Sequence, residues 1–249
     1  MNFDRIRALL LEQAVQGKLV PQLEDEPTVE QIGEAPEDVP FAIPDKWKWC
    51  NSELIQTLVR GITFPSSAKQ TIAAPGFIRC LTTGSVQRSY RPSSDVFVAP
   101  TFIRRKKQLL LNGDVVISSA NSMELVGKNI LWNKDENDVS FGGFLTIVRT
   151  SNGLVLHPEF LSLIYQYLFE TGYFANIATQ TTNIANLTNK KLNEIPFPIP
   201  PLAEQHRIVA KLEESFAEID RAEEAANTHR CTEKEDPSGS GDGEARPAA

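Results

Sequence analysis

The sequence predicts an α+β protein, with one β-rich domain and packed helices between two flanking helices of the coiled-coil type. Short β-like runs bounded by Gly, Pro, Asn or Ser dominate from Trp47 to about Thr150. Apolar residues recur at helical spacing near both ends of the chain. A proline-rich stretch, NEIPFPIPPL at 193–202, runs directly into the second helical pattern. A length of 249 residues suits one sizeable domain with extensions.

The first 45 residues are predicted to form a short helix and then a linker. Apolar side chains recur at helical spacing at Phe3, Ile6, Leu10 and Ala14. Gly17 suits the position just after a last helical turn, so a helix is expected over 3–16, within an N-terminal spacer segment assigned to 1–20. Segment 21–45 carries five prolines and many acidic residues, which is typical of a linker, with one weak helical turn near 29–32.

Residues 46–200 are assigned to the β-rich domain. Strands are expected in the runs FIRCL (77–81), DVFVA (95–99), DVVIS (114–118), KNILW (128–132) and FLTIVRT (144–150). Pro158 is expected to open a helix, and a short helical turn is expected over 189–194. The three prolines within 196–200 cannot donate a ladder hydrogen bond, so this segment is predicted to be an edge strand or polyproline II.

Segment 201–227 is predicted to be a spacer helix whose direction is set by the prolines before it. Its apolar stripe consists of Ile208, Leu212, Ser215, Ile219, Ala222 and Ala226, broadened by Val209 and Phe216. About 25 residues at about 1.5 Å each span roughly 35–40 Å. The periodicity then ends, and 228–249 is predicted to be a disordered tail.

Charge is distributed unevenly along the chain. The net charge is −7, with −7 on residues 1–45, +6 on 46–200 and −6 on 201–249. The stretch 79–107 holds seven Lys or Arg residues and a single acid, Asp95. Such a basic middle favours an anionic partner, and a well-solvated basic face is the equal alternative.

The chemistry of catalysis is not indicated by any motif. The three histidines lack metal-ligand spacing, and the sequence contains no P-loop and no convincing carboxylate cluster. We therefore predict no catalytic residue and no metal site. Three cysteines, odd in number and far apart, indicate a reduced cytoplasmic protein rather than a disulfide framework. Neither a transmembrane helix nor a signal peptide fits the hydropathy pattern, so no membrane partner is expected.

Binding chemistry is indicated instead. The cations suited to phosphates are Arg79, Arg88, Arg91, Arg104, Arg105, Lys106, Lys107 and Lys128. The polar side chains suited to phosphates or base edges are Thr82, Thr83, Gln87, Ser118, Ser119, Asn121, Gln180, Thr181, Thr182 and Asn183. The alternative is that these residues lie in loops, which are polar in most proteins.

Several segments together resemble the specificity subunits of type I restriction-modification systems. The run IPFPIPPLAEQHRIVAKLEESFAEID resembles the junction that closes a target recognition domain, where a proline-rich strand feeds a spacer helix. Two further runs together resemble the junction at the other end of such a domain, LLLEQAVQGKLVPQ and PFAIPDKWKWC. Two more runs are similar to internal segments of the family's recognition domain, GDVVISSANSMELVGKNILW and NLTNKKLNEIPFPIPP. The resemblance covers about residues 5–225.

The resemblance implies a target recognition domain that binds double-stranded DNA and supplies no catalysis. In this family the methylation subunits bind S-adenosylmethionine and flip the adenine. S-adenosylmethionine, ATP and Mg²⁺ are thus expected only on partner subunits, with no cofactor on this chain. The implied partners are methylation subunits, restriction subunits through the complex, and a second copy of the same half-subunit. The residues expected at a subunit interface are Ile6, Leu10, Ile208, Leu212, Phe216 and Ile219.

A chain with one such domain resembles half of a specificity subunit. Two copies with two-fold symmetry would direct adenine methylation and cleavage to a bipartite palindromic target. The short predicted helices favour an alternative, a truncated or vestigial fragment that acts only as a coiled-coil module for methylation subunits. A nuclease or methyltransferase acting alone is disfavoured by the missing motifs.

Overall fold

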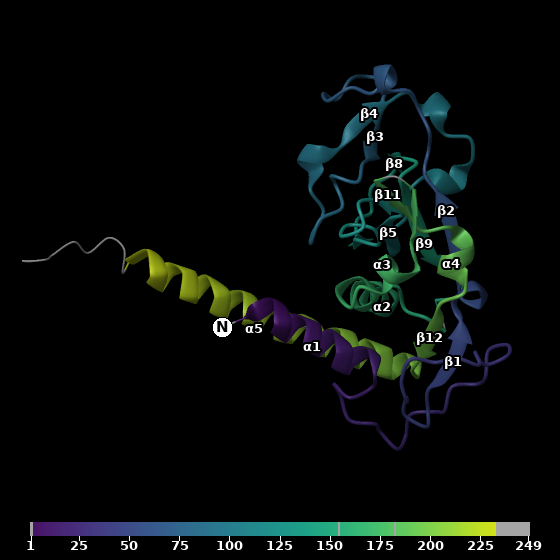
Figure 1. The fold of residues 1–249 in the computed structure, drawn as a ribbon, viewed down its shortest axis with the longest axis vertical. Helices are drawn as coiled ribbons and strands as arrows, with labels where there is room; N and C mark the ends of the chain where they lie inside the picture. Colours follow the sequence, from purple (N-terminus) through teal and green to yellow (C-terminus); the bar gives the residue numbers. More distant parts are fainter. Residues whose placement is uncertain (1, 154, 182, 233–249) are drawn as a thin grey trace, which may run out of the picture.

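The computed structural model describes residues 2–153, 155–181 and 183–232, with side chains described up to 226. Its β-rich body lies on one side of a pair of helices, α1 (Phe3–Val15) and α5 (Leu202–Thr232). These two helices run antiparallel across the bottom of the body, and α5 continues past the start of α1 (Figure 1). None of the described helices is both long and apolar enough to cross a bilayer.

A four-stranded antiparallel sheet forms the centre of the body. Its strands, in spatial order, are β2 (Gln56–Arg60), β9 (Leu145–Thr150), β5 (Asp114–Ser118) and β7 (Asn129–Trp132). Every residue of β5 is buried. Because side chains alternate along a strand, Val115 and Ile117 pack into the helix-side core, whereas Val116 packs into the core on the opposite face.

Two smaller sheets flank this centre. One contains β4 (Val96–Val98), β3 (Ile78–Leu81) and β8 (Val139–Phe141), and β3 pairs in parallel only with β8. It supplies Leu81 and Phe141 to the second core. The other contains β10 (Thr179–Thr181), β11 (Ile184–Asn186) and β6 (Ala120–Asn121), all antiparallel. Short 3₁₀ helices occupy Ser52–Leu54, Ser66–Ala68, Pro92–Ser94, Pro100–Phe102 and Lys106–Gln108.

Helices cover the first face of the central sheet. Helix α2 (Pro158–Glu170) presents Phe160 and Ile164 to the sheet, and both side chains are almost fully buried. Helices α3 (Tyr173–Ile177) and α4 (Asn189–Asn193) follow it in the chain. The apolar faces of α1 and α5 join the same core, which contains Leu11, Ala14, Val15, Ile208 and Leu212.

The β-rich body joins the helix pair through one two-stranded ribbon. Strand β1 (Lys48–Asn51) pairs antiparallel with β12 (Pro196–Ile199). The prolines are tolerated because this ribbon has no third strand that needs their missing amide hydrogens. Beside the ribbon, the buried Trp47 indole donates a 2.9 Å hydrogen bond to Oε2 of Glu204 in the first turn of α5. The predicted edge strand is confirmed.

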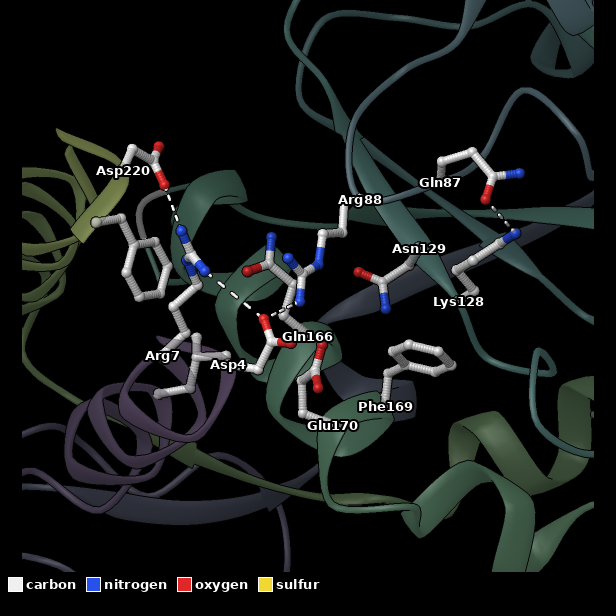
Figure 2. A pocket seen from close by; sticks show the side chains of 12 residues that line it. Asp4, Arg7, Gln87, Arg88, Lys128, Asn129, Gln166, Phe169, Glu170 and Asp220 are labelled. Atoms are coloured by element: carbon white, nitrogen blue, oxygen red, sulfur yellow. Dashed lines mark hydrogen bonds and ion pairs between the residues drawn. The ribbon is translucent and has the colours of Figure 1, made fainter. Parts of the chain in front are cut away.

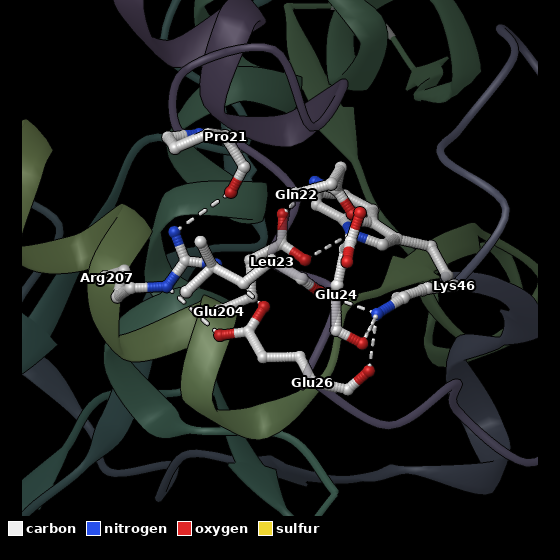
Figure 3. Close-up of polar contacts among 9 residues, drawn as sticks. Pro21, Gln22, Leu23, Glu24, Glu26, Lys46, Glu204 and Arg207 are labelled. Carbon is white, nitrogen blue, oxygen red and sulfur yellow. Dashed lines mark hydrogen bonds and ion pairs between the residues drawn. The ribbon is translucent and has the colours of Figure 1, made fainter.

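The start of the segment 21–45, residues 21–26, is fastened to α5 and to Lys46 (Figure 3). Arg207 binds Glu26 through two hydrogen bonds of 3.0 and 2.7 Å and also donates to the carbonyl of Pro21. The Lys46 ammonium donates to three backbone carbonyls of residues 23, 24 and 26 at 2.6–2.9 Å. The acidic linker is therefore a packed strap, and the helical turn predicted near 29–32 is absent from it.

Most predicted elements are confirmed, including the five named strand runs and the helix opened by Pro158. The final helix is longer than predicted, because it continues to Thr232 instead of ending near 227. At 31 residues it spans about 46 Å, so a short helix no longer supports truncation. The rest of the predicted tail, 233–249, lies outside the described residues.

The residues predicted for a subunit interface lie mostly inside this chain. Ile208 and Leu212 are 0 % and 1 % exposed, and the structure assigns them to the chain's own core rather than to a contact between subunits. Ile219 is also buried, and Leu10 and Phe216 pack partly buried against the same core. Ile6 is half-buried on α1. The coiled-coil arrangement between two subunits stays a prediction.

Candidate nucleic-acid interface

The basic run Arg104–Lys107 forms an exposed segment with a fixed backbone. All four side chains are exposed. The buried side chain of Gln108 accepts hydrogen bonds from the amides of Arg104 and Arg105 at 3.1 and 3.2 Å. It also donates to the carbonyl of Arg60 at the end of β2. The run therefore presents four cations from a loop that is held against the central sheet.

Gln87 and Arg88 in the loop 82–91 lie at the gap between the body and the helix pair (Figure 2). Lys128 is 8 % exposed, and its ammonium donates to Oε1 of Gln87 at 3.1 Å. Burial, and then the charge of nearby Arg91, lower the pKa of Lys128. The exposed guanidinium of Arg88 pairs with the carboxylate of Asp4 on α1. These three side chains are brought together, and each already has a partner within the chain.

A cavity of about 490 Å³ lies at this gap, and its charges are mixed. The cations Arg7, Arg88 and Lys128 line it together with the acids Asp4, Glu170 and Asp220 (Figure 2). Arg7 is itself paired with Asp220 at 2.5 Å and with Glu223 at 2.9 Å. Such compensation makes this cavity a poor site for a polyanion.

Polar residues of the smallest sheet gather at another place. Asn121 lies on β6, which pairs with β11, and β11 pairs with β10. Gln180 and Thr181 on β10 and Asn183 in the turn are exposed. The hairpin thus presents amide and hydroxyl groups in the form that base edges accept. Thr182 lies outside the described residues.

Three predicted contacts are corrected by the structure. Ser118 is fully buried and accepts a 3.0 Å hydrogen bond from Asn121, and Ser119, at 4 % exposed, bonds with Thr146 at 3.0 Å. Both hydroxyls therefore position neighbouring groups instead of facing solvent. Arg79 lies on β3 with its guanidinium paired with Glu136 and 3.8 Å from Asp95. Its charge is compensated within the protein.

Thr82 and Thr83 directly follow β3. The Thr82 hydroxyl donates to the carbonyl of Ser94 at 2.9 Å and accepts from the amide of Gly84. Thr82 and Thr83 line a second hollow, together with Arg60, Lys69 and Phe144. The sequence analysis missed these last three residues, because each stands alone in the sequence without a cluster of similar residues.

The described residues contain no group of three or more His, Cys, Asp or Glu side chains that could hold a metal ion. Two histidines that are far apart in sequence, His157 and His206, stack with ring centroids 4.1 Å apart. Cys50 and Cys80 are fully buried, and burial raises the pKa of each thiol to about 12. These thiols are protonated and poorly nucleophilic at neutral pH.

The fold and its exposed cations define a β-rich binding module carried on a pair of helices. The family model described as "Type I restriction modification DNA specificity domain" matches residues 44–227. The chain therefore belongs to this family, as the sequence motifs predict, and membership implies recognition of DNA sequence.

Known proteins similar to this chain agree with the family. The chain is 24 % identical to the type I restriction enzyme StySPI specificity subunit of Salmonella potsdam and 25 % identical to the EcoKI specificity subunit of Escherichia coli K12. Each alignment covers 72 % of this chain and 38 % of the relative. The chain thus matches well under half of the length of these relatives.

Solved structures show the same fold at low identity. The HsdS subunit from Thermoanaerobacter tengcongensis superposes with a TM-score of 0.60 at 19 % identity, over 89 % of this chain and 46 % of that chain. A chain from a study of complex assembly and conformational transition of the type I R-M system gives 0.61 at 20 % identity, over 92 % of this chain and 51 % of that one.

Proposed function

We propose that this chain is a non-catalytic DNA-recognition subunit of a cytoplasmic type I restriction-modification complex. It directs adenine methylation and cleavage by partner subunits to a bipartite DNA target. S-adenosylmethionine, ATP and Mg²⁺ act on those partner subunits in this proposal. The observation that carries it is the exposed basic run Arg104–Lys107 on a family-typical body. Cations without acidic partners bind the phosphates of DNA and release its counterions.

Roles for the predicted residues follow from their surroundings. The basic run and Arg91 are exposed, so they are assigned to phosphates. Asn121, Gln180 and Asn183 are assigned to base edges, because they share one small sheet and its turn, on which Gln180 and Asn183 are exposed. Thr82 and Thr83 are assigned to supporting contacts near the phosphates, whereas Gln87 and Lys128 bind each other in the charge-compensated cavity, and Arg88 contacts DNA only after it leaves Asp4.

A second candidate function is a helical interaction module that binds methylation subunits without selecting DNA. The extension of α5 past α1 favours it, because that part of the helix has no packing partner in the picture (Figure 1). A homodimer of half-subunits would use the same extension. The two functions are compatible with one fold, and they differ in whether the chain itself prefers particular DNA.

The first experiment measures binding of labelled duplex DNA by fluorescence anisotropy over a series of salt concentrations. R104A/R105A should weaken binding to all sequences and lower the slope of log K against log salt by about 1.8, because each phosphate contact contributes about 0.9. The matched control is K18A/K211A, which removes two exposed cations, one shortly after α1 and one on α5. An unchanged slope in R104A/R105A would remove the basic run from the interface.

The second experiment tests the role in the complex. The chain is co-expressed with a methylation subunit, and the mass of the assembly is measured by light scattering. Methylation of the host DNA is then mapped. A bipartite methylated motif that changes with substitutions at Asn121 or Gln180 supports direction of methylation. A stable assembly with no methylated motif favours the interaction module.

A further inference from the structure

A second hollow, of about 550 Å³, opens beside the end of β2 and away from the helix pair. The turn between β8 and β9, Gly142–Phe144, forms one wall. This turn lies flush against the chain after β2, because a Cβ built on Gly61 would come within 2.2 Å of the Gly142 carbonyl oxygen. The amide of Gly61 also donates to the carbonyl of Leu145 at 3.1 Å. The hollow therefore has a rigid rim.

The charge of this hollow is positive and uncompensated. Arg60 and Lys69 line it, and none of its lining residues is acidic. Both side chains are exposed, and neither has an ion pair with a carboxylate in the described part of the chain. The Arg60 Nε donates to the carbonyl of Gly143 at 3.1 Å, which holds the guanidinium at the rim. The cavity near the helix pair, with three acids, lacks this property.

An exposed aromatic ring stands at the same rim. Phe144 is 61 % exposed, which is unusual for a large apolar side chain. Its carbonyl accepts hydrogen bonds from the amides of Ser119 and Ala120 at 3.0 and 3.2 Å, and from the Ser119 hydroxyl at 3.2 Å. The backbone that carries the ring is therefore fixed. A ring held ready in this way loses little entropy when a ligand covers it.

Both polar surfaces described above adjoin this hollow. Gln108 ties the basic run to the carbonyl of Arg60, so the cations continue from the hollow onto Arg104–Lys107. On the other side, Ala120 begins β6, which carries Asn121. The hollow thus lies between the segment assigned to phosphates and the sheet assigned to base edges.

We propose that this hollow receives one nucleotide unit of duplex DNA, which deepens the proposed function and rests on it. Arg60 and Lys69 bind the phosphate, and the Phe144 ring contacts the apolar edge of a base. Complementary charge selects DNA as the occupant, since a cationic rim without acids attracts a polyanion. Thymine is the base with the largest apolar edge in the major groove, because of its methyl group.

The phosphate part is tested by the salt dependence of duplex binding with the full chain. R60A/K69A should lower the slope of log K against log salt by about 1.8, the value for two phosphate contacts. The charge-preserving variant R60K/K69R should keep the slope of the wild type, and K18A/K211A should leave it unchanged. Circular dichroism checks that each variant folds. A wild-type slope in R60A/K69A, beside a lowered slope in R104A/R105A, overturns the hollow as a phosphate site.

The base part is tested with duplexes selected from a randomised pool. The wild-type chain and F144A are each used for selection. Each thymine of the preferred sequence is then replaced by uracil, one position at a time. Loss of the methyl at one position should weaken wild-type binding several-fold and leave F144A unaffected. F144L should retain part of the effect. Equal losses in wild type and F144A overturn the contact.

The two levels of failure are distinguishable. If the wild-type chain shows no salt-dependent binding to duplex DNA, the proposed function and this inference both fall. If the wild type binds duplex DNA and the basic run contributes to that binding, but Arg60, Lys69 and Phe144 do not, only the nucleotide site in the hollow is refuted.

Discussion

The ion pair between Arg149 on β9 and Asp114 on β5 gives the sharpest test of how the body is stabilised. Asp114 is fully buried, and Arg149 binds it through both carboxylate oxygens at 2.6 and 2.7 Å. The same guanidinium donates to the carbonyl of Leu109, just beyond the basic run. R149M removes the cation and leaves a buried carboxylate without its charge partner. Breaking such a pair costs about 3–5 kcal/mol.

The assay is thermal unfolding followed by circular dichroism. For a chain of this size each kcal/mol shifts Tm by about 2–4 °C, so R149M should lower Tm by about 6–20 °C. D114N/R149M should regain part of this loss, because no charge is then buried. The control R221M, at an exposed position of α5, should stay within about 0.5 kcal/mol of the wild type. A wild-type Tm for R149M, or no gain in D114N/R149M, would refute the reasoning.

Two further predictions concern the core. Because burial raises the thiol pKa of Cys50 and Cys80 to about 12, the folded chain keeps two protons that the unfolded chain loses above a pKa of about 8.5. The free energy of unfolding should therefore fall above that pH, by at most about 1.4 kcal/mol per pH unit for each thiol. C50A/C80A, compared in urea titrations at several pH values, should show a shallower fall; an equal fall contradicts the assignment. The second prediction is G127A, which places a Cβ 2.2 Å from the Phe174 ring at φ +89° and should cost about 2–5 kcal/mol in urea unfolding. The control G172A has a similar φ and open space around it, so a loss as large as that of G127A would show that crowding is not the cause.

The sequence predicts the strands of the central sheet well, because their runs of β-branched and aromatic residues are buried and bounded by turn residues. It misses β2 in that sheet and also β1, β6, β8, β10 and β11, since runs such as QTLVR and VSF are short and partly polar. It also underestimates α5. The apolar stripe ends near Ala226, but the backbone stays helical to Thr232, so the end of the stripe does not mark the end of the helix.

The candidate site is only partly predictable from the sequence. Exposed loop cations such as Arg104 follow from a local cluster of like charges. The compensation of Arg79 does not, because Glu136 lies on a distant part of the chain. The burial of Ser118 depends on the strand that follows β5, and the hollow around Arg60 arises only when three segments meet. Such features can be identified only from the tertiary structure, because they depend on segments that are far apart in the sequence.

Because β1 pairs with β12, the chain enters and leaves the β-rich body at the same place. The chain enters the body along one strand of the ribbon and leaves along the other, so both crossings lie side by side at the foot of α5 (Figure 1). Residues 52–195 are therefore one continuous insertion between the two strands, and a different body would fit the same helix pair only if it kept the apolar face of α2 that packs on α1 and α5.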